Sequence, residues 1–184
     1  MPGFQALRNQ SDTDYQGKLE TYAVDAAHAS LLAPGDVVVI TGEADAEGRA
    51  EIDAAAAGAA ITGVIAAVRP LFDTENLTET GLPALQSGFV HCHIAPNQNF
   101  EVDVINGPLV VADVGLNADI DATAATKSGG LTVSNMTLDA GTIATTATLQ
   151  FRIVSLKEDA AGVLGNRAVV RFNNTTLNTG TAGI

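Results

Sequence analysis

His91-Cys92-His93 is the stretch whose residue types are most suggestive of chemistry. Side chains alternate between the two faces of a strand, so His91 and His93 would share one face and Cys92 would point the other way. A metal site would need a third ligand, such as His28 or an aspartate. A nucleophilic pair of Cys92 with His28 is also open. The simpler interpretation is a polar strand face and a small buried thiol, so we expect no metal, no cofactor and no catalytic residue.

Paired carboxylates are a second candidate. Glu101 and Asp103 would share one strand face, and so would Glu51 and Asp53. Glycosidases use such pairs, but within a sugar-binding cleft that aromatic side chains usually line. The chain has no Trp and two Tyr, so a solvated strand face is the better interpretation.

Calcium is a third possibility, because carboxylates supply the oxygen ligands that it prefers. Residues 119–121 and the loop at 45–53 are the two places that could hold it. Neither matches an EF-hand loop, and the sequence has no P-loop, dinucleotide-binding or hydrolase motif. The sequence therefore favours a protein that is not an enzyme.

Charge is unevenly distributed along the 184 residues, whose formal net charge is −12. Residues 20–139 carry 17 acidic and three basic groups, whereas residues 140–184 carry two acidic and four basic groups. Phosphate contacts need clustered Lys and Arg, so we expect no nucleic-acid partner. No apolar run is long enough to span a membrane, and the first residues lack the pattern of a signal peptide. We therefore expect synthesis in the cytosol and no membrane partner.

Many short strands separated by turns predict an all-β fold, a β-sandwich or barrel of short antiparallel strands. Residues 106–107, Asn-Gly, predict a hairpin turn with 109–112 as the return strand. Residues 54–60 are mostly Ala but contain Gly, and we expect a loop or one helical turn. Strands are expected at 37–40, 61–68, 89–94, 100–105, 149–156 and 168–174.

The domain organisation follows from the point in the chain where the strand pattern begins. Residues 1–19 are polar, with two apolar anchors, Phe4 and Leu7, and predict an extended N-terminal arm, with a frayed terminus as the alternative. Residues 20–184 predict one β-rich domain. A division of that domain into two β subdomains, 20–99 and 100–184, is left open.

Three motifs, taken in order, resemble capsid-decoration (cement) proteins of tailed bacteriophages, in particular those of marine and cyanobacterial phages. The first is Pro-Gly-Asp-Val-Val-Val-Ile-Thr-Gly at 34–42, an acidic hairpin, and Ile-Thr-Gly-Val at 61–64. The second is Phe-Glu-Val at 100–102 followed by residues 113–119. The third is residues 149–156, a charged loop, and residues 166–174. The loop departs from the pattern in its apolar segment at 160–164, which leaves its contacts in doubt.

The resemblance implies a β-rich homotrimer on the outer surface of an icosahedral phage head, with the major capsid protein as partner. It also implies an N-terminal segment that reaches across neighbouring capsomers. We expect lattice contacts from the arm and from a basic C-terminal patch: Phe4, Leu7, Arg152, Arg167 and Arg171. The alternatives are another virion part, such as a head-fibre base, tail component or adhesin, or a carbohydrate-binding β-sandwich.

Overall fold

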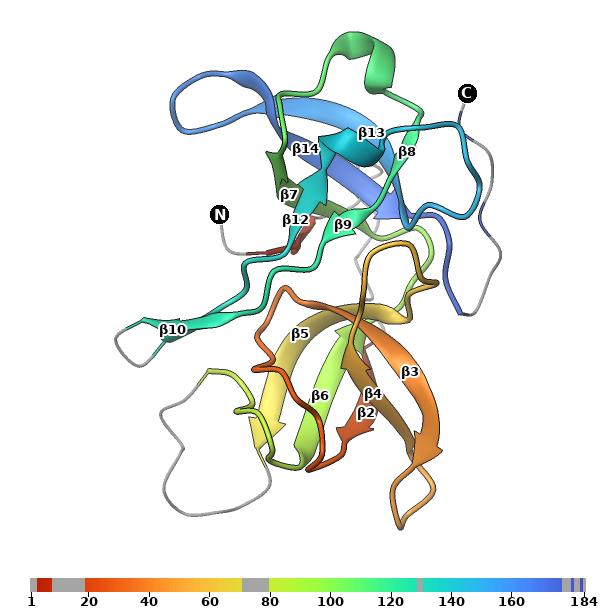
Figure 1. The fold of residues 1–184 in the computed structure, drawn as a ribbon, viewed down its shortest axis with the longest axis vertical. Coiled ribbons are helices and arrows are strands. Elements are labelled where there is room, and N and C mark those ends of the chain that lie inside the picture. Colours follow the sequence, from red (N-terminus) through yellow and green to blue (C-terminus); the bar gives the residue numbers. More distant parts are fainter. Residues whose placement is uncertain are drawn as a thin grey trace.

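The structure is a computed structural model that describes residues 3–7, 19–70, 80–128, 131–176, 180 and 183. Its strands form two stacked groups (Figure 1), a closed barrel below and a larger open sheet above. The expectation of an all-β fold is confirmed. Helical structure within the described residues is limited to two single turns of 3₁₀ helix, η1 (Val111–Asp113) and η2 (Ala140–Thr142).

The barrel closes in the order β2-β4-β3-β5-β6. Its strands are β2 (Leu19–Val24), β3 (Val37–Ala44), β4 (Ala50–Ala54), β5 (Gly63–Pro70) and β6 (Gly88–His93). Alternate side chains point inward and fill the interior. The buried interior residues are Tyr22, Val24, Leu32, Val38, Ile52, Ile65, Leu82, Val90 and Cys92.

The upper sheet is ordered β8-β13-β14-β7-β12-β9, with β1 paired to β7. Its long strands are β7 (Asn99–Ile105), β13 (Phe151–Glu158) and β14 (Leu164–Phe172). The short ones are β1 (Gln5–Leu7), β8 (Asn117–Ala118), β9 (Ile120–Asp121) and β12 (Thr137–Asp139). A separate hairpin of β10 (Thr126–Ser128) and β11 (Leu131–Val133) extends sideways between the two groups (Figure 1).

Two details of the strand arrangement differ from the sequence prediction. First, not every pairing is antiparallel, because β2 pairs β4 in parallel and β12 pairs β7 in parallel. Second, Asn106 and Gly107 have the positive φ of a turn, but residues 109–112 do not return along β7. Pro108 has no N–H to give to a ladder, and the amide of Leu109 instead donates to the carbonyl of Gly165 at 3.0 Å.

The two groups of strands share one hydrophobic cluster. Val37, Ile61 and Val64 of the barrel side pack in the same cluster as Phe100 and Phe151 of the upper sheet. Gln150, fully buried, donates from its side chain to the carbonyls of residues 56 and 59, at 2.7 and 2.9 Å. The two groups of strands correspond to the two subdomains, 20–99 and 100–184, that the sequence analysis left open. They share a core, and their separate folding stays a prediction.

The N-terminal segment is built into this core where the structure describes it. Phe4 is 2% exposed and stacks on Phe151 with ring centroids 4.6 Å apart. β1 adds to the edge of β7, with Gln5 opposite Glu101 and Leu7 opposite Asn99. The Phe4 ring faces the interior of this chain, and a lattice contact through it stays a prediction. Residues 1–2 and 8–18 of the predicted arm lie outside the described residues.

Among the described residues, none of the helices has the length and apolar character that crossing a membrane would require.

Candidate functional site

The His91-Cys92-His93 stretch lies on β6 with the predicted alternation. Cys92 is fully buried inside the barrel, and burial raises the pKa of its thiol to about 12. A thiol with this pKa stays protonated at neutral pH and is a poor nucleophile. The hypothesis of a Cys92–His28 pair gains no support, because the Nδ1 of His28 lies 2.7 Å from the carbonyl oxygen of Asp25 and its buried Nε2 has no hydrogen-bond partner among the described residues.

The two histidines of this strand are each engaged with the protein. His91 Nδ1 lies 2.9 Å from the Thr21 hydroxyl oxygen. The His93 ring packs edge-on against Phe100 with centroids 6.1 Å apart, and burial lowers the pKa of His93. Across the described ranges, no three His, Cys, Asp or Glu side chains are grouped as a metal site would need.

The candidate calcium positions are occupied by internal hydrogen bonds. Asp119 accepts the Gln150 amide at 3.1 Å. Asp121 accepts the Thr123 hydroxyl at 2.6 Å. In the 45–53 loop, Asp45 accepts both the amide of Arg49 and its Nε, at 2.7 and 2.9 Å. These carboxylates organise turns.

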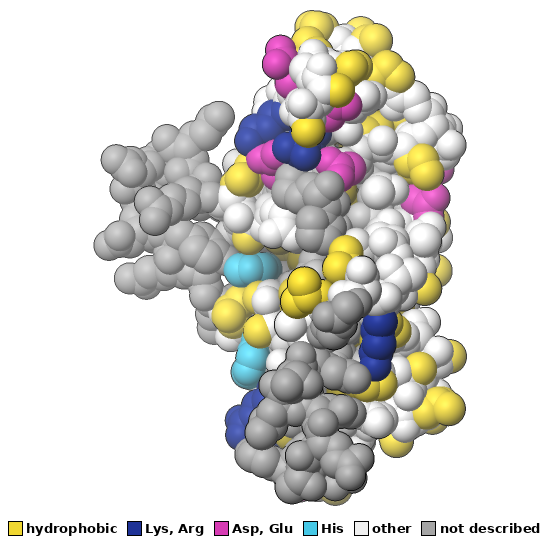
Figure 2. Space-filling view, turned by 90° about the vertical axis from the view of Figure 1, so that its left-hand side faces the viewer, with side chains coloured by type: hydrophobic (Ala, Val, Ile, Leu, Met, Phe, Trp, Pro, Cys, Tyr) yellow, Lys and Arg dark blue, Asp and Glu magenta, His cyan; other side chains and the backbone are white. Residues whose placement is uncertain are grey.

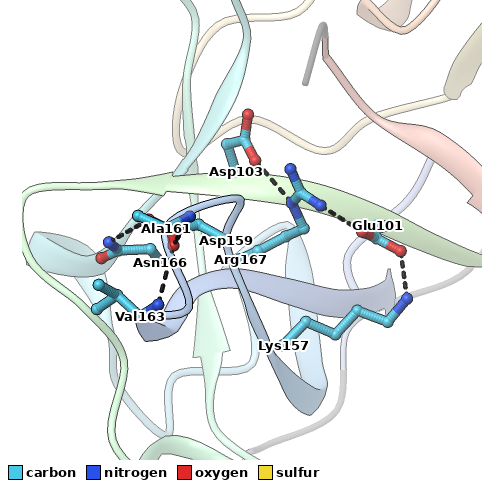
Figure 3. Close-up of polar contacts among 8 residues, drawn as sticks. All are labelled: Glu101, Asp103, Lys157, Asp159, Ala161, Val163, Asn166 and Arg167. Atoms are coloured by element: carbon cyan, nitrogen blue, oxygen red, sulfur yellow. Dashed lines mark hydrogen bonds and ion pairs between the residues drawn. The ribbon is translucent and has the colours of Figure 1, made fainter.

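The pair Glu101 and Asp103 does share one face of β7, and Arg167 on β14 bridges it. Arg167 Nε donates to Asp103 at 3.0 Å and its terminal nitrogen donates to Glu101 at 3.2 Å. Lys157 of β13 also binds Glu101, so the carboxylate lies between two cations (Figure 3). Two of the four cations of the C-terminal region are thereby neutralised, and the expected basic patch is not continuous.

Arg152 and Arg171 form the remainder of that patch. They lie directly opposite each other in the β13–β14 ladder. Arg152 Nε donates to the side-chain oxygen of Asn117 at 3.2 Å. Like charges in directly opposite positions repel, so this pair costs stability and keeps positive charge on the outer face of the sheet. Whether Arg152, Arg167, Arg171 or Leu7 contacts another protein stays a prediction.

An apolar surface at the upper end of the molecule was not foreseen. It combines residues around η1 with the tip of the β13–β14 hairpin, and the Leu109–Gly165 hydrogen bond joins these two loops. Figure 2 shows hydrophobic side chains gathered at this end, above a band of mixed charge. We call this surface the apolar end, and its exposed members are Val110, Val111, Val114, Val163 and Leu164.

Sequence reasoning missed the apolar end because it placed residues 109–112 in the return strand of a hairpin. Val111 is instead 76% exposed. Pro108 was the available signal, since it has no N–H to donate to a ladder with β7. The second signal was the apolar content of the loop at 160–164, which departs from the resembling proteins.

Comparison of the chain with protein-family models, with curated proteins and with solved structures finds no match in any of the three. The functional argument therefore depends on the residues and on the geometry described above.

Proposed function

We propose that this chain is a structural capsid-decoration, or cement, protein. In this proposal it binds the outer surface of an icosahedral phage head and stabilises contacts between capsomers of the major capsid protein. The proposal is based on the three motifs between residues 34 and 174, whose sequences and order resemble those of such proteins. The observation that carries it furthest in the structure is the apolar end.

The apolar end has the character of an association surface. Soluble monomers rarely expose contiguous apolar patches larger than a few hundred Å², and exposed apolar patches commonly mark binding sites. Here five aliphatic side chains come from two loops that a backbone hydrogen bond holds together. Residues on such hairpin tips reach a partner first, while the sheet behind them keeps their positions fixed.

A cement function needs no strong single contact. A protein that binds the assembled shell, and not its free parts, stabilises the shell by mass action. Many copies on a symmetric lattice add their contacts through avidity. A small apolar surface on each copy is sufficient under these conditions. A homotrimer would multiply it, and that oligomeric state remains part of the proposal.

The decisive experiment is sedimentation of undecorated, expanded heads mixed with the purified protein, after its mass in solution has been measured by light scattering. We expect saturable co-sedimentation. Val111→Asp should weaken binding by about tenfold or more, because the interface would bury an unpaired charge. Leu85→Asp is the matched control, since Leu85 is similarly exposed but lies on a loop of the barrel.

One outcome would contradict head binding, and another would show that the apolar end is not the binding surface. Wild-type protein that remains in the supernatant at saturating concentration would contradict it and would favour the adhesin or glycan-binding alternatives. Equal weakening by Val111→Asp and Leu85→Asp would retain head binding but remove the apolar end from it.

A further inference from the structure

A cavity of about 710 Å³ opens on the outside of the barrel, away from the apolar end. The strand register builds its floor. Arg69 lies opposite Phe89, Phe89 opposite Ala23, and Ala23 opposite Glu51, so the four residues form one row across β5, β6, β2 and β4. The volume is within the range of pockets that hold small ligands or single side chains.

Glu51 is the unusual member of this row. It is 7% exposed, it lines the cavity, and within the described part of the chain its carboxylate has no hydrogen-bond or ion-pair partner. Burial raises the pKa of Glu51, and the nearby carboxylates of Asp25, Glu43 and Asp45 raise it further. A buried carboxylate without a partner is costly. Two cations, Arg49 and Arg69, line the same cavity.

The nearest cation that the sequence supplies on this hairpin does not fill the position. Arg49 donates to Asp45 at 2.9 Å and to Glu47 at 3.1 Å. Its guanidinium also lies 4.5 Å from the centre of the Phe89 ring. Arg49 is therefore held at the rim by two carboxylates and one aromatic ring, and Glu51 faces the cavity without it.

The chemistry of the lining selects an organic cation. Ala23 offers apolar contact for a methylene stem beside Phe89, whose ring already carries the Arg49 guanidinium. Glu51 offers two oxygen acceptors at the floor. A guanidinium matches a carboxylate with two parallel hydrogen bonds and is more weakly hydrated than an ammonium group. An arginine side chain therefore fits the cavity better than a lysine side chain.

We propose that this cavity receives one arginine side chain from the partner protein, paired with the carboxylate of Glu51. The inference rests on the proposed function, since the partner is then the capsid lattice. It adds a second contact, of a different kind from the apolar end. The apolar end would contribute burial, and the cavity would select a partner surface that carries an arginine.

The first test uses a small probe and needs no phage head. N-acetyl-arginine amide is titrated into isotope-labelled protein, and the resonances of Ala23, Glu51 and Phe89 are followed by NMR. We expect saturable shifts at these residues. N-acetyl-citrulline amide, which is neutral and nearly the same shape, should produce none. Absence of shifts with the arginine probe, or equal shifts with both probes, would overturn the proposal.

The second test uses Glu51→Gln, with Glu158→Gln as the matched control on an exposed position at the end of β13. Glu51→Gln should fold and unfold at a higher temperature than wild type, because it removes an unpaired buried charge. It should lose the probe shifts and bind heads about tenfold more weakly. Glu158→Gln should keep the probe shifts, which are its control readout because Glu158 lies opposite Leu164 of the apolar end.

The results distinguish this inference from the proposed function. If Glu51→Gln binds heads as tightly as wild type does, the arginine site is contradicted and the cement function is not affected. Wild type that shows the probe shifts but never binds heads would contradict the cement function and leave a cation site whose partner is another protein.

Discussion

Asp36 shows how a single buried group sets conditions on the whole fold. It lies in the turn before β3 and is almost fully buried, and its side chain accepts the Ala33 amide at 2.7 Å. Burial raises the pKa of this carboxyl from its ordinary 3.8 to about 6, against the opposing effects of Ser134 and the Ala33 amide. Because Ser134 belongs to the upper half of the molecule, Asp36 titrates at the junction between the two groups of strands.

The sign of the effect follows from linkage. The folded chain holds the Asp36 proton more tightly than the unfolded chain does, so protonation stabilises the fold. That contribution is complete below pH 3.8 and is lost as the pH rises through about 6. We expect Asp36→Asn to remove this part of the pH dependence, which amounts to at most about 3 kcal/mol.

Urea unfolding of both proteins between pH 4 and pH 7.5 measures the difference. The Asn side chain keeps an oxygen acceptor for the Ala33 amide, so the variant should be the more stable protein at neutral pH and should lose that advantage at the acidic end. Identical pH slopes for the two proteins would show that Asp36 does not titrate in this window.

At the scale of the element, the segment around the short strand β1 contributes more to stability than its three residues suggest. Phe4, directly before it, joins the rings of Phe100, Phe151 and Phe172 in one aromatic cluster. Truncating a buried phenylalanine leaves a cavity and costs about 3–5 kcal/mol. We expect Phe4→Ala to lower the free energy of unfolding by about that amount.

The matched control is Leu7→Ala, on the same strand but only half-buried, which should cost about 1 kcal/mol. Chemical denaturation monitored by circular dichroism compares the two variants. If Phe4→Ala costs no more than Leu7→Ala, the N-terminal segment does not stabilise the fold in the way described here.

The hairpin between β13 and β14 allows a second comparison, because it contains two glycines of similar conformation. Gly162 and Gly165 have φ of +81° and +89°. A Cβ on Gly162 would meet no atom within 4 Å, whereas a Cβ on Gly165 would lie 2.0 Å from the carbonyl oxygen of Leu109. Both Ala variants have the strain of a left-handed conformation, about 1 kcal/mol.

Gly165→Ala must in addition separate the two loops of the apolar end. We expect it to cost about 2 kcal/mol more than Gly162→Ala in thermal or urea unfolding. It should also weaken head binding, while Gly162→Ala leaves binding unchanged. Equal effects of the two substitutions would mean that the loops move apart freely.

Periodicity was sufficient to predict most strands, because alternation and turn residues are local signals. The strands expected at 37–40, 100–105 and 149–156 correspond to β3, β7 and β13 with shifts at their ends. The parallel pairing of β2 with β4 could not be predicted in this way, since it depends on closure of the barrel. That pairing puts Ala23 beside Glu51, so the cavity was beyond sequence reasoning although Glu51 had been noticed.

For the candidate site residues, too, local features could be predicted and long-range partners could not. Shared faces were predicted correctly for Glu101 with Asp103, because spacing along one strand decides them. Their partner Arg167 is 64 residues away from Asp103, and no local pattern joins them. The expected basic patch counted Arg167 as an available charge, whereas the fold pairs it with two carboxylates; the contact role of the patch stays a prediction.

For the whole molecule, the two groups of strands behave as one unit because they share a core and several cross-connections. The β10–β11 hairpin adds one of these, since the amide of Thr132 donates to the Thr80 hydroxyl at 2.8 Å. A unit of this kind can transmit load between a contact at its upper end and another on the barrel. We expect the purified protein to raise the temperature at which undecorated heads release DNA.

The size of this shift should increase with the logarithm of the free protein concentration, as linkage requires. A DNA-binding dye reports release during a temperature ramp. Val111→Asp should need about tenfold more protein for the same shift. A shift that is independent of concentration, or one that an unrelated acidic protein reproduces, would contradict stabilisation by specific binding.

The burial of Phe4 has a consequence for the order of events during translation. The ribosome makes Phe4 early, but its ring partners at 100, 151 and 172 emerge much later, on the order of ten to thirty seconds at bacterial rates. The two loops of the apolar end are likewise separated in time. A nascent chain can therefore neither seal its N-terminal segment nor assemble the apolar end, and only a finished chain presents that surface.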